Sequence, residues 1–152
     1  PIQGDSQPTI APQGVLWARH QHTFAGVADW EENRRRYYQM LYFQGRDPKW
    51  LRTALTGCRD IEACMALFGW DRFNATLSSA ARPLTLGEID DEVEYFRSFR
   101  ENFDAALAYE PLLHYAVYRI DTDLPAEFLS RWYELGEPQV HGSYVLTPLT
   151  RR

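Results

Sequence analysis

The stretch that decides the fold runs from residue 15 to residue 45 and reads VLWARHQHTFAGVADWEENRRRYYQMLYFQG. Residues 15–24 carry β-branched and aromatic side chains in approximate alternation, which predicts a first core strand. Asp29 and Glu32 have the spacing of a capping box, so we expect a helix that begins at Trp30 and stops at Gly45. This helix would fold back over the strand and organise the core around it.

Similar start signals occur at two later points of the chain. Asp47 followed by Pro48 places a capping residue before a proline at the first helical position. Thr85 and Glu88 form a second capping box, followed by apolar residues at helical spacing. A further apolar pattern follows Pro125. We therefore expect helices over residues 48–56, 86–107 and 125–135.

Short apolar runs between these helices predict strands over residues 65–70, 112–120 and 140–147. The run 112–120 is apolar at nearly every position, as expected of a central strand covered on both faces. The run 140–147 alternates, which indicates one less protected face and allows an antiparallel position at the sheet edge. The resulting alternation predicts an α/β fold, a three-layer domain with a small, mostly parallel sheet of three to five strands and three to four flanking helices.

The length and charge of the chain limit its class. Its 152 residues are enough for one substantial core, so we expect a flexible lead-in over residues 1–13 and a single domain over 14–152. The net charge is −5, and the basic run 34–36 follows Glu31 and Glu32 at a spacing that pairs charges on a helix. We therefore expect no nucleic-acid partner. No run reaches the 18–20 apolar residues of a transmembrane segment.

Cys58 and Cys64 are separated by five residues, too many for a Cys-x-x-Cys motif. On one continuous helix their side chains would point about 120° apart. If the segment is irregular and the compartment oxidising, the two could form a small disulfide loop. The alternative is two unrelated buried thiols. The sequence leaves both open.

His20 and His22 are the main candidates for chemistry. On a strand, the pair would place both imidazoles on one side, as two ligands of zinc or another divalent metal require. A third ligand could come from His114, His141, Asp29 or a glutamate. The alternative is that both histidines are polar residues at a strand end that bond to the next loop.

Other catalytic motifs find little support. On the long helix we place the carboxylates of Asp90, Asp91, Glu92 and Glu94 on the solvent-facing side. The chain contains neither a Gly-x-Ser-x-Gly elbow nor a glycine-rich phosphate loop. The sequence therefore favours a non-catalytic role and leaves the question of an enzyme open.

Aromatic residues are the most unusual part of the composition, with five Trp, nine Tyr and eight Phe. Core packing explains most of them by their helical spacing, and the remainder would form a docking interface. We predict that this interface contains Trp17, Tyr42, Phe43, Trp50, Trp70, Trp132 and Tyr133.

The order of these features resembles the extracytoplasmic C-terminal domain of some bacterial polytopic membrane proteins of GT-C glycosyltransferase-like type. The segments that carry the resemblance are residues 15–20, 31–36, 114–118, 131–134 and 142–146. The likeness is one of pattern and spans about residues 14–149. It implies a soluble tail or scaffold whose catalytic acids lie in membrane-side loops outside this chain, so no catalytic residue is carried over.

Two functions follow as expectations. The first is a non-catalytic, extracytoplasmic and membrane-associated accessory or tail domain, without a cofactor, that docks on a protein partner or on its parent membrane protein. A cytoplasmic location also stays open. The second is a small metal-binding module or metal-dependent enzyme that uses His20 and His22.

Overall fold

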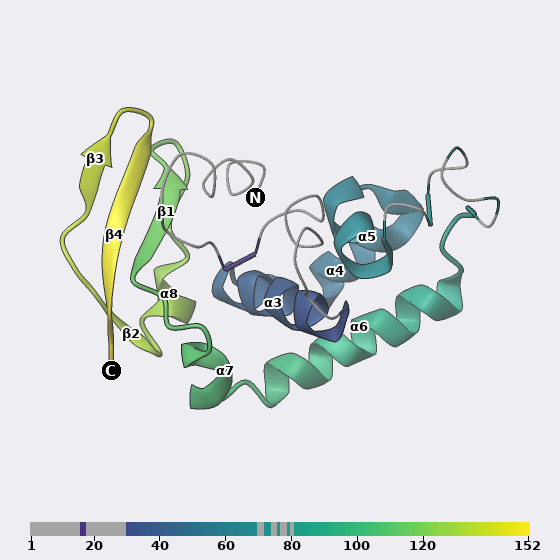
Figure 1. The fold of residues 1–152 in the computed structure, drawn as a ribbon, viewed down its shortest axis with the longest axis horizontal. Coiled ribbons are helices and arrows are strands. Elements are labelled where there is room, and N and C mark those ends of the chain that lie inside the picture. The colour runs from purple at the N-terminus through teal and green to yellow at the C-terminus, as the bar shows by residue number, and fades with distance from the viewer. Residues whose placement is uncertain (1–15, 18–29, 70–71, 74–75, 77–78, 80) are drawn as a thin grey trace.

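The computed structural model describes residues 16–17, 30–69, 72–73, 76, 79 and 81–152 (Figure 1). Helices come first along the chain: α3 (Trp30–Phe43), α4 (Pro48–Leu55), the 3-10 turn η3 (Thr56–Cys58), α5 (Ile61–Phe68), α6 (Leu86–Glu101) and α7 (Ala105–Tyr109). The strands and one short helix follow: β1 (Tyr115–Arg119), α8 (Ala126–Leu129), β2 (Tyr133–Leu135), β3 (Gln139–His141) and β4 (Tyr144–Arg151).

Strand β4 holds the sheet together. It pairs with β1 along one edge, and with β2 and β3 along the other, and every pairing is antiparallel. The strands β3 and β4 form a hairpin with a two-residue loop, in which Gly142 has a φ of +59°. Such tight loops require positive φ values, which glycine adopts without steric cost.

The predicted mostly parallel sheet is wrong. Parallel neighbours need a crossover connection of a dozen or more residues, whereas only two residues separate β3 from its partner β4, and β1 and β2 also pair with β4 in the antiparallel sense. The predicted strand over 65–70 falls largely in helix α5, because a six-residue apolar run fits a buried helix end equally well. Six α-helices, not three to four, occur among the described residues.

Predictions based on local signals were the most accurate. The helix expected from Trp30 spans Trp30–Phe43, and α4 begins at Pro48 with the Asp47 side chain accepting from the backbone N–H of Trp50. The long helix expected over 86–107 is interrupted, because Asp104 caps a separate helix α7.

The C-terminal elements also differ from the prediction. The helix expected over 125–135 is shorter and gives way to strand β2. The strand expected in mid-sheet over 112–120 is the five-residue β1, which lies at an edge of the sheet formed by the described residues. The strand expected over 140–147 is a hairpin whose second arm, β4, is central. The first predicted strand, residues 15–24, lies almost wholly outside the described residues.

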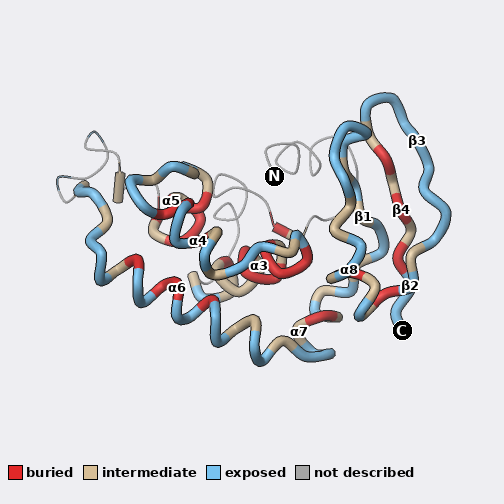
Figure 2. Tube along the Cα trace, turned by 180° about the vertical axis from the view of Figure 1, so that it is seen from behind, coloured by how far each residue is buried: buried red, intermediate tan, exposed pale blue. Residues whose placement is uncertain are grey.

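Helix α3 belongs to both hydrophobic cores of the domain. Its residues Tyr37, Tyr38 and Leu41 pack in a first core with α4, α5 and α6. At its C-terminal end, Tyr42 and Phe43 pack in a second core with residues of α7, α8, β2 and β4. Figure 1 shows α3 between the other helices on one side and the sheet on the other, and Figure 2 shows buried residues along α3, on the helices beside it and along β4.

A buried ion pair fastens α3 to α6. Arg34 donates from Nη2 to Glu92 Oε2 at 2.6 Å and from Nε to Oε1 at 3.0 Å, and the Tyr38 hydroxyl donates to the same carboxylate. Glu92 is only 5% exposed, so its expected place on the solvent-facing side is wrong. It lies three residues after the buried Ile89 and therefore on the same face of the helix.

The surroundings of this pair determine its protonation. Burial raises the pKa of Tyr38, and the charge of Glu92 raises it further, so the phenol stays protonated. Burial alone would lower the pKa of Arg34, but Tyr38 and Glu92 raise it above its ordinary value. The contact is therefore a permanent charge pair with a neutral hydrogen-bond donor beside it.

We predict that Glu92→Ala lowers the free energy of unfolding by about 3 kcal/mol, because Arg34 and Tyr38 lose their shared acceptor inside the domain. Urea unfolding would measure the change. Asp91→Ala is the matched control, since Asp91 is the exposed neighbour on the same helix, and it should change stability by less than about 0.5 kcal/mol. Equal losses in the two variants would contradict a structural role for the pair.

Candidate functional site

The predicted metal ligands are not brought together by the described part of the chain. His20, His22 and Asp29 lie outside the described residues, and His114 and His141 are exposed. No group of three or more His, Cys, Asp or Glu side chains that could hold a metal occurs among the described residues. The metal site at the two histidines stays a prediction.

The structure joins Cys58 and Cys64 in a disulfide with a Cα–Cα distance of 5.8 Å. Cys64 lies on α5 and is fully buried, whereas Cys58 ends the 3-10 turn that precedes it. Gly57 and Cys58 have φ values of +63° and +47°, so the backbone turns sharply before Asp60 caps α5. The two cysteines do not lie on one continuous helix. Their side chains are therefore not held about 120° apart, and they can form a disulfide.

The predicted interface aromatics are mostly internal. Tyr42, Phe43 and Tyr133 are buried in the second core, Trp17 is buried in the first, Trp50 and Trp132 are half-buried, and Trp70 lies outside the described residues. The Trp17 indole donates to Asn33 Oδ1 at 3.0 Å, and the Trp132 indole donates to the Tyr42 hydroxyl at 3.2 Å. Helical spacing shows that aromatic residues share a face, but not whether another element covers that face.

An exposed apolar surface occurs instead on the sheet. Tyr115 and Val117 on β1 are 54% and 46% exposed. Residues opposite each other in an antiparallel pair project to the same face. The face that carries them, which we call the outer sheet face, therefore includes Tyr115, Val117, Arg119, Tyr144, Leu146 and Pro148, and Gln139 and His141 of β3 lie on it beside Leu146 and Tyr144.

The other face of the sheet is covered over β2 and β4, whereas Val140 of β3 is 61% exposed there. Ala116 on β1 and Leu149 on β4 pack in or against the second core, and Thr147 is buried. The sheet is therefore covered on one face only, as antiparallel sheets commonly are. The exposure of one face of β1 was hard to predict from the sequence, since residues 115–118 are all apolar or aromatic and show no clear alternation.

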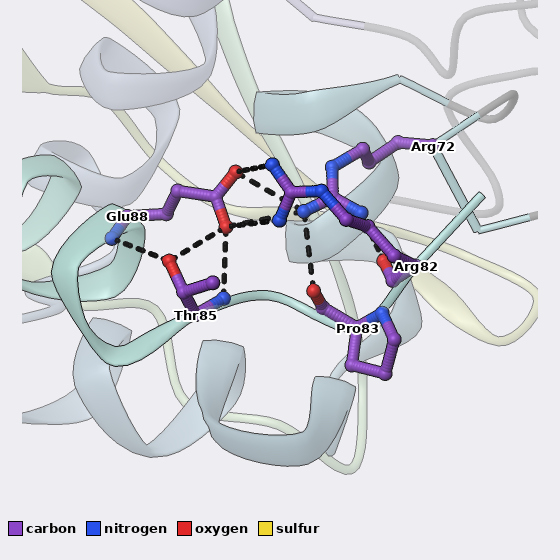
Figure 3. Close-up of polar contacts among 5 residues, drawn as sticks. All are labelled: Arg72, Arg82, Pro83, Thr85 and Glu88. Atoms are coloured by element: carbon purple, nitrogen blue, oxygen red, sulfur yellow. Dashed lines mark hydrogen bonds and ion pairs between the residues drawn. The ribbon is translucent and has the colours of Figure 1, made fainter. Parts of the chain in front are cut away.

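A second charged cluster lies at the start of α6 (Figure 3). The Glu88 carboxylate accepts from Arg72 at 3.1 Å and from Arg82 at 3.0 Å, and the backbone N–H of Thr85 donates to it at 2.8 Å. Arg72 also donates to the carbonyl oxygen of Pro83 at 3.2 Å. These contacts complete the predicted capping box and attach Arg72 and Arg82 to the start of the helix.

The charge environment of Glu88 argues against acid catalysis there. Hydrogen bonds from Arg82 and from the Thr85 backbone, with a further one from Arg72, hold the pKa of Glu88 far below its usual range. A general acid or base works best with a pKa near the working pH. Glu88 and Glu92 are both bound to arginines, so both clusters are suited to structural roles.

The basic run on α3 pairs with carboxylates only partly as its spacing predicts, because Arg34 pairs with Glu92 on α6. Arg35 and Arg36 both pair with Glu32, at 2.7 and 2.6 Å. Hydrogen bonds from these arginines, that from Arg35 being the stronger influence, lower the pKa of Glu32. No helix among the described residues is long and apolar enough to cross a membrane.

Comparisons of the chain with protein-family models, with curated proteins and with solved structures find no match. The resemblance to extracytoplasmic tail domains therefore stays a hypothesis.

We predict that Glu88→Gln weakens the dependence of stability on pH. In the folded protein the pKa of Glu88 is lowered, whereas in the unfolded chain it is about 4.3. As the pH falls below about 5, the unfolded chain takes up the proton first, so the stabilisation by ionised Glu88 is present above that pH and is lost below it. Unfolding midpoints at pH 7, 5, 4 and 3 would measure this.

The wild type should lose more stability than Glu88→Gln between pH 5 and pH 3. At pH 7 the variant should be less stable by about 1 kcal/mol, the typical value of a helix cap. Glu101→Gln, at an exposed position on the same helix, is the control and should follow the wild-type curve. Parallel curves for the wild type and Glu88→Gln would show that the carboxylate is not preferentially ionised in the folded state.

Proposed function

We propose that this chain is a non-catalytic accessory or tail domain of an extracytoplasmic, membrane-associated protein or complex, and that it docks on a protein partner. The observation that carries the proposal is the outer sheet face, where Tyr115 and Val117 are exposed side by side with apolar neighbours. Contiguous apolar surface is unfavourable in water unless another surface covers it.

The composition of the outer sheet face fits a protein surface as its ligand. Its centre is apolar, formed by Val117 opposite Leu146 and Tyr115 opposite Pro148. Its charged member, Arg119, lies at the end of β1 and pairs with Asp121 at 2.7 Å. An apolar centre with a polar rim is the usual arrangement in protein interfaces.

Two further observations support the proposed extracytoplasmic location and the proposed non-catalytic role. A disulfide between Cys58 and Cys64 is typical of proteins that fold in oxidising compartments, and it agrees with the resemblance to extracytoplasmic tails. The carboxylates of Glu88 and Glu92 are already bound to arginines, which favours binding over acid–base chemistry.

The compartment can be tested through the two cysteines. In the native host we expect both thiols to resist alkylation in denaturant until a reductant is added, because they are oxidised in the cell. Cys58→Ser is the control, since its remaining Cys64 should react in denaturant without reductant. Closing a loop of this length stabilises a protein by about 2 kcal/mol, so Cys58→Ser should also unfold more easily. Immediate alkylation of both wild-type thiols would contradict an oxidising compartment.

Docking can be tested with a photo-crosslinking amino acid at position 117, in the protein expressed in its native host. We expect a discrete protein adduct that disappears when Tyr115→Lys is added, since a charge on the outer sheet face would have to be desolvated. The same amino acid at position 94, which is exposed on α6, is the control and should give no such adduct. No adduct at 117, or the same adduct at both positions, would count against docking through the sheet.

A further inference from the structure

Two arginines from separate segments lie over the same aromatic ring. Arg100 lies in the last turn of α6 and Arg131 follows α8. Arg100 also donates from Nη1 to the backbone oxygen of Arg46, whose own guanidinium stacks on Trp50. We call Arg100 and Arg131 the arginine cluster.

Aromatic rings fix the guanidinium groups of this cluster. The guanidinium carbon of Arg100 is 5.3 Å from the ring centre of Phe128 and 5.5 Å from that of Tyr42. The guanidinium carbon of Arg131 is 4.8 Å from the same Phe128 ring. Cation–π contacts at these distances are attractive and restrict the side chains. Two positive groups are therefore held beside one ring.

The positive charge of the cluster is only partly neutralised. Arg131 pairs with Glu127 at 2.6 Å, but both side chains are exposed, so the pair is weak. No carboxylate lies within ion-pair distance of Arg100 among the residues that the structure describes. Asp47, which acts on Arg100 through space, uses its carboxylate to cap α4, accepting from the Trp50 N–H at 2.7 Å.

The environment of Arg100 favours an added negative charge. Burial lowers its pKa and the charge of Arg131 lowers it further, whereas Tyr42 and Asp47 act in the opposite direction. Within the described part of the chain, the guanidinium of Arg100 makes one hydrogen bond, to the Arg46 carbonyl, so most of its N–H donors stay available. An anion gains more binding free energy at a half-buried guanidinium without a charged partner than at a solvated arginine.

We propose that Arg100 and Arg131 bind the oxyanion group of a ligand, either a phosphate or a carboxylate. The guanidinium fork matches both groups, because it offers two parallel N–H donors to two oxygens. The bound anion supplies the counter-charge that Arg100 lacks and competes with Glu127 for Arg131. This site is separate in composition from the outer sheet face and does not depend on the docking proposal.

The test is a titration of the folded protein with inorganic phosphate and, separately, with acetate, each against sodium chloride of equal ionic strength. We expect one of the two to raise the melting temperature in a saturable way, and the more effective anion identifies the chemistry of the ligand. In Arg100→Met the affinity should fall at least tenfold. Arg97→Met is the matched control on the same helix, where Arg97 pairs with the exposed Glu94, and it should retain the effect.

A second measurement covers the case in which Arg100→Met fails to fold. In the wild type, the Nε–H resonance of Arg100 should shift during the same titration, while that of Arg97 should not. The proposal is overturned if neither anion stabilises the protein beyond chloride, if Arg100→Met and Arg97→Met respond alike, or if the two resonances shift equally.

Discussion

The rest of the structure depends on the position of helix α3, because side chains from its fourteen residues pack in both hydrophobic cores. Its buried polar side chains fix how it can lie. Asn33 donates to the carbonyl oxygen of Ala66 at 2.8 Å, Arg34 pairs with Glu92, and Gln39 donates to the carbonyl oxygen of Glu110 at 2.9 Å. Buried polar groups are costly unless they are paired, so these contacts orient α3 against α5, α6 and the chain after α7.

The position of α3 explains why the sheet is covered on one face only. Its last residues, Tyr42 and Phe43, join the core that meets Leu149 of β4, and this core covers the inner side of the sheet. No described element packs over Tyr115 and Val117 on the other side, and both stay exposed. The aromatic residues of the sequence are divided between the core of the helices and the core that joins the helices to the sheet, and the outer sheet face is the surface that we propose for docking.

Arginine is the residue that connects most of these elements, in two different ways. At Glu88 and Glu92 it pairs with carboxylates and connects segments of the helical part of the domain. At Arg100 it packs on aromatic rings and has no carboxylate partner among the described side chains. The second arrangement is the one that we propose as an anion site.

The sequence by itself determined the helix starts, because a cap is a contact between residues three apart. Asp47 before Pro48 and Thr85 with Glu88 were sufficient for this. Only the tertiary structure decided the direction of the strands, the exposure of Val117, the burial of Tyr133 and the joining of Cys58 to Cys64. Each of these depends on which distant segment lies opposite a residue. Apolar periodicity indicates that one face of an element is buried, but it does not indicate which other element covers that face.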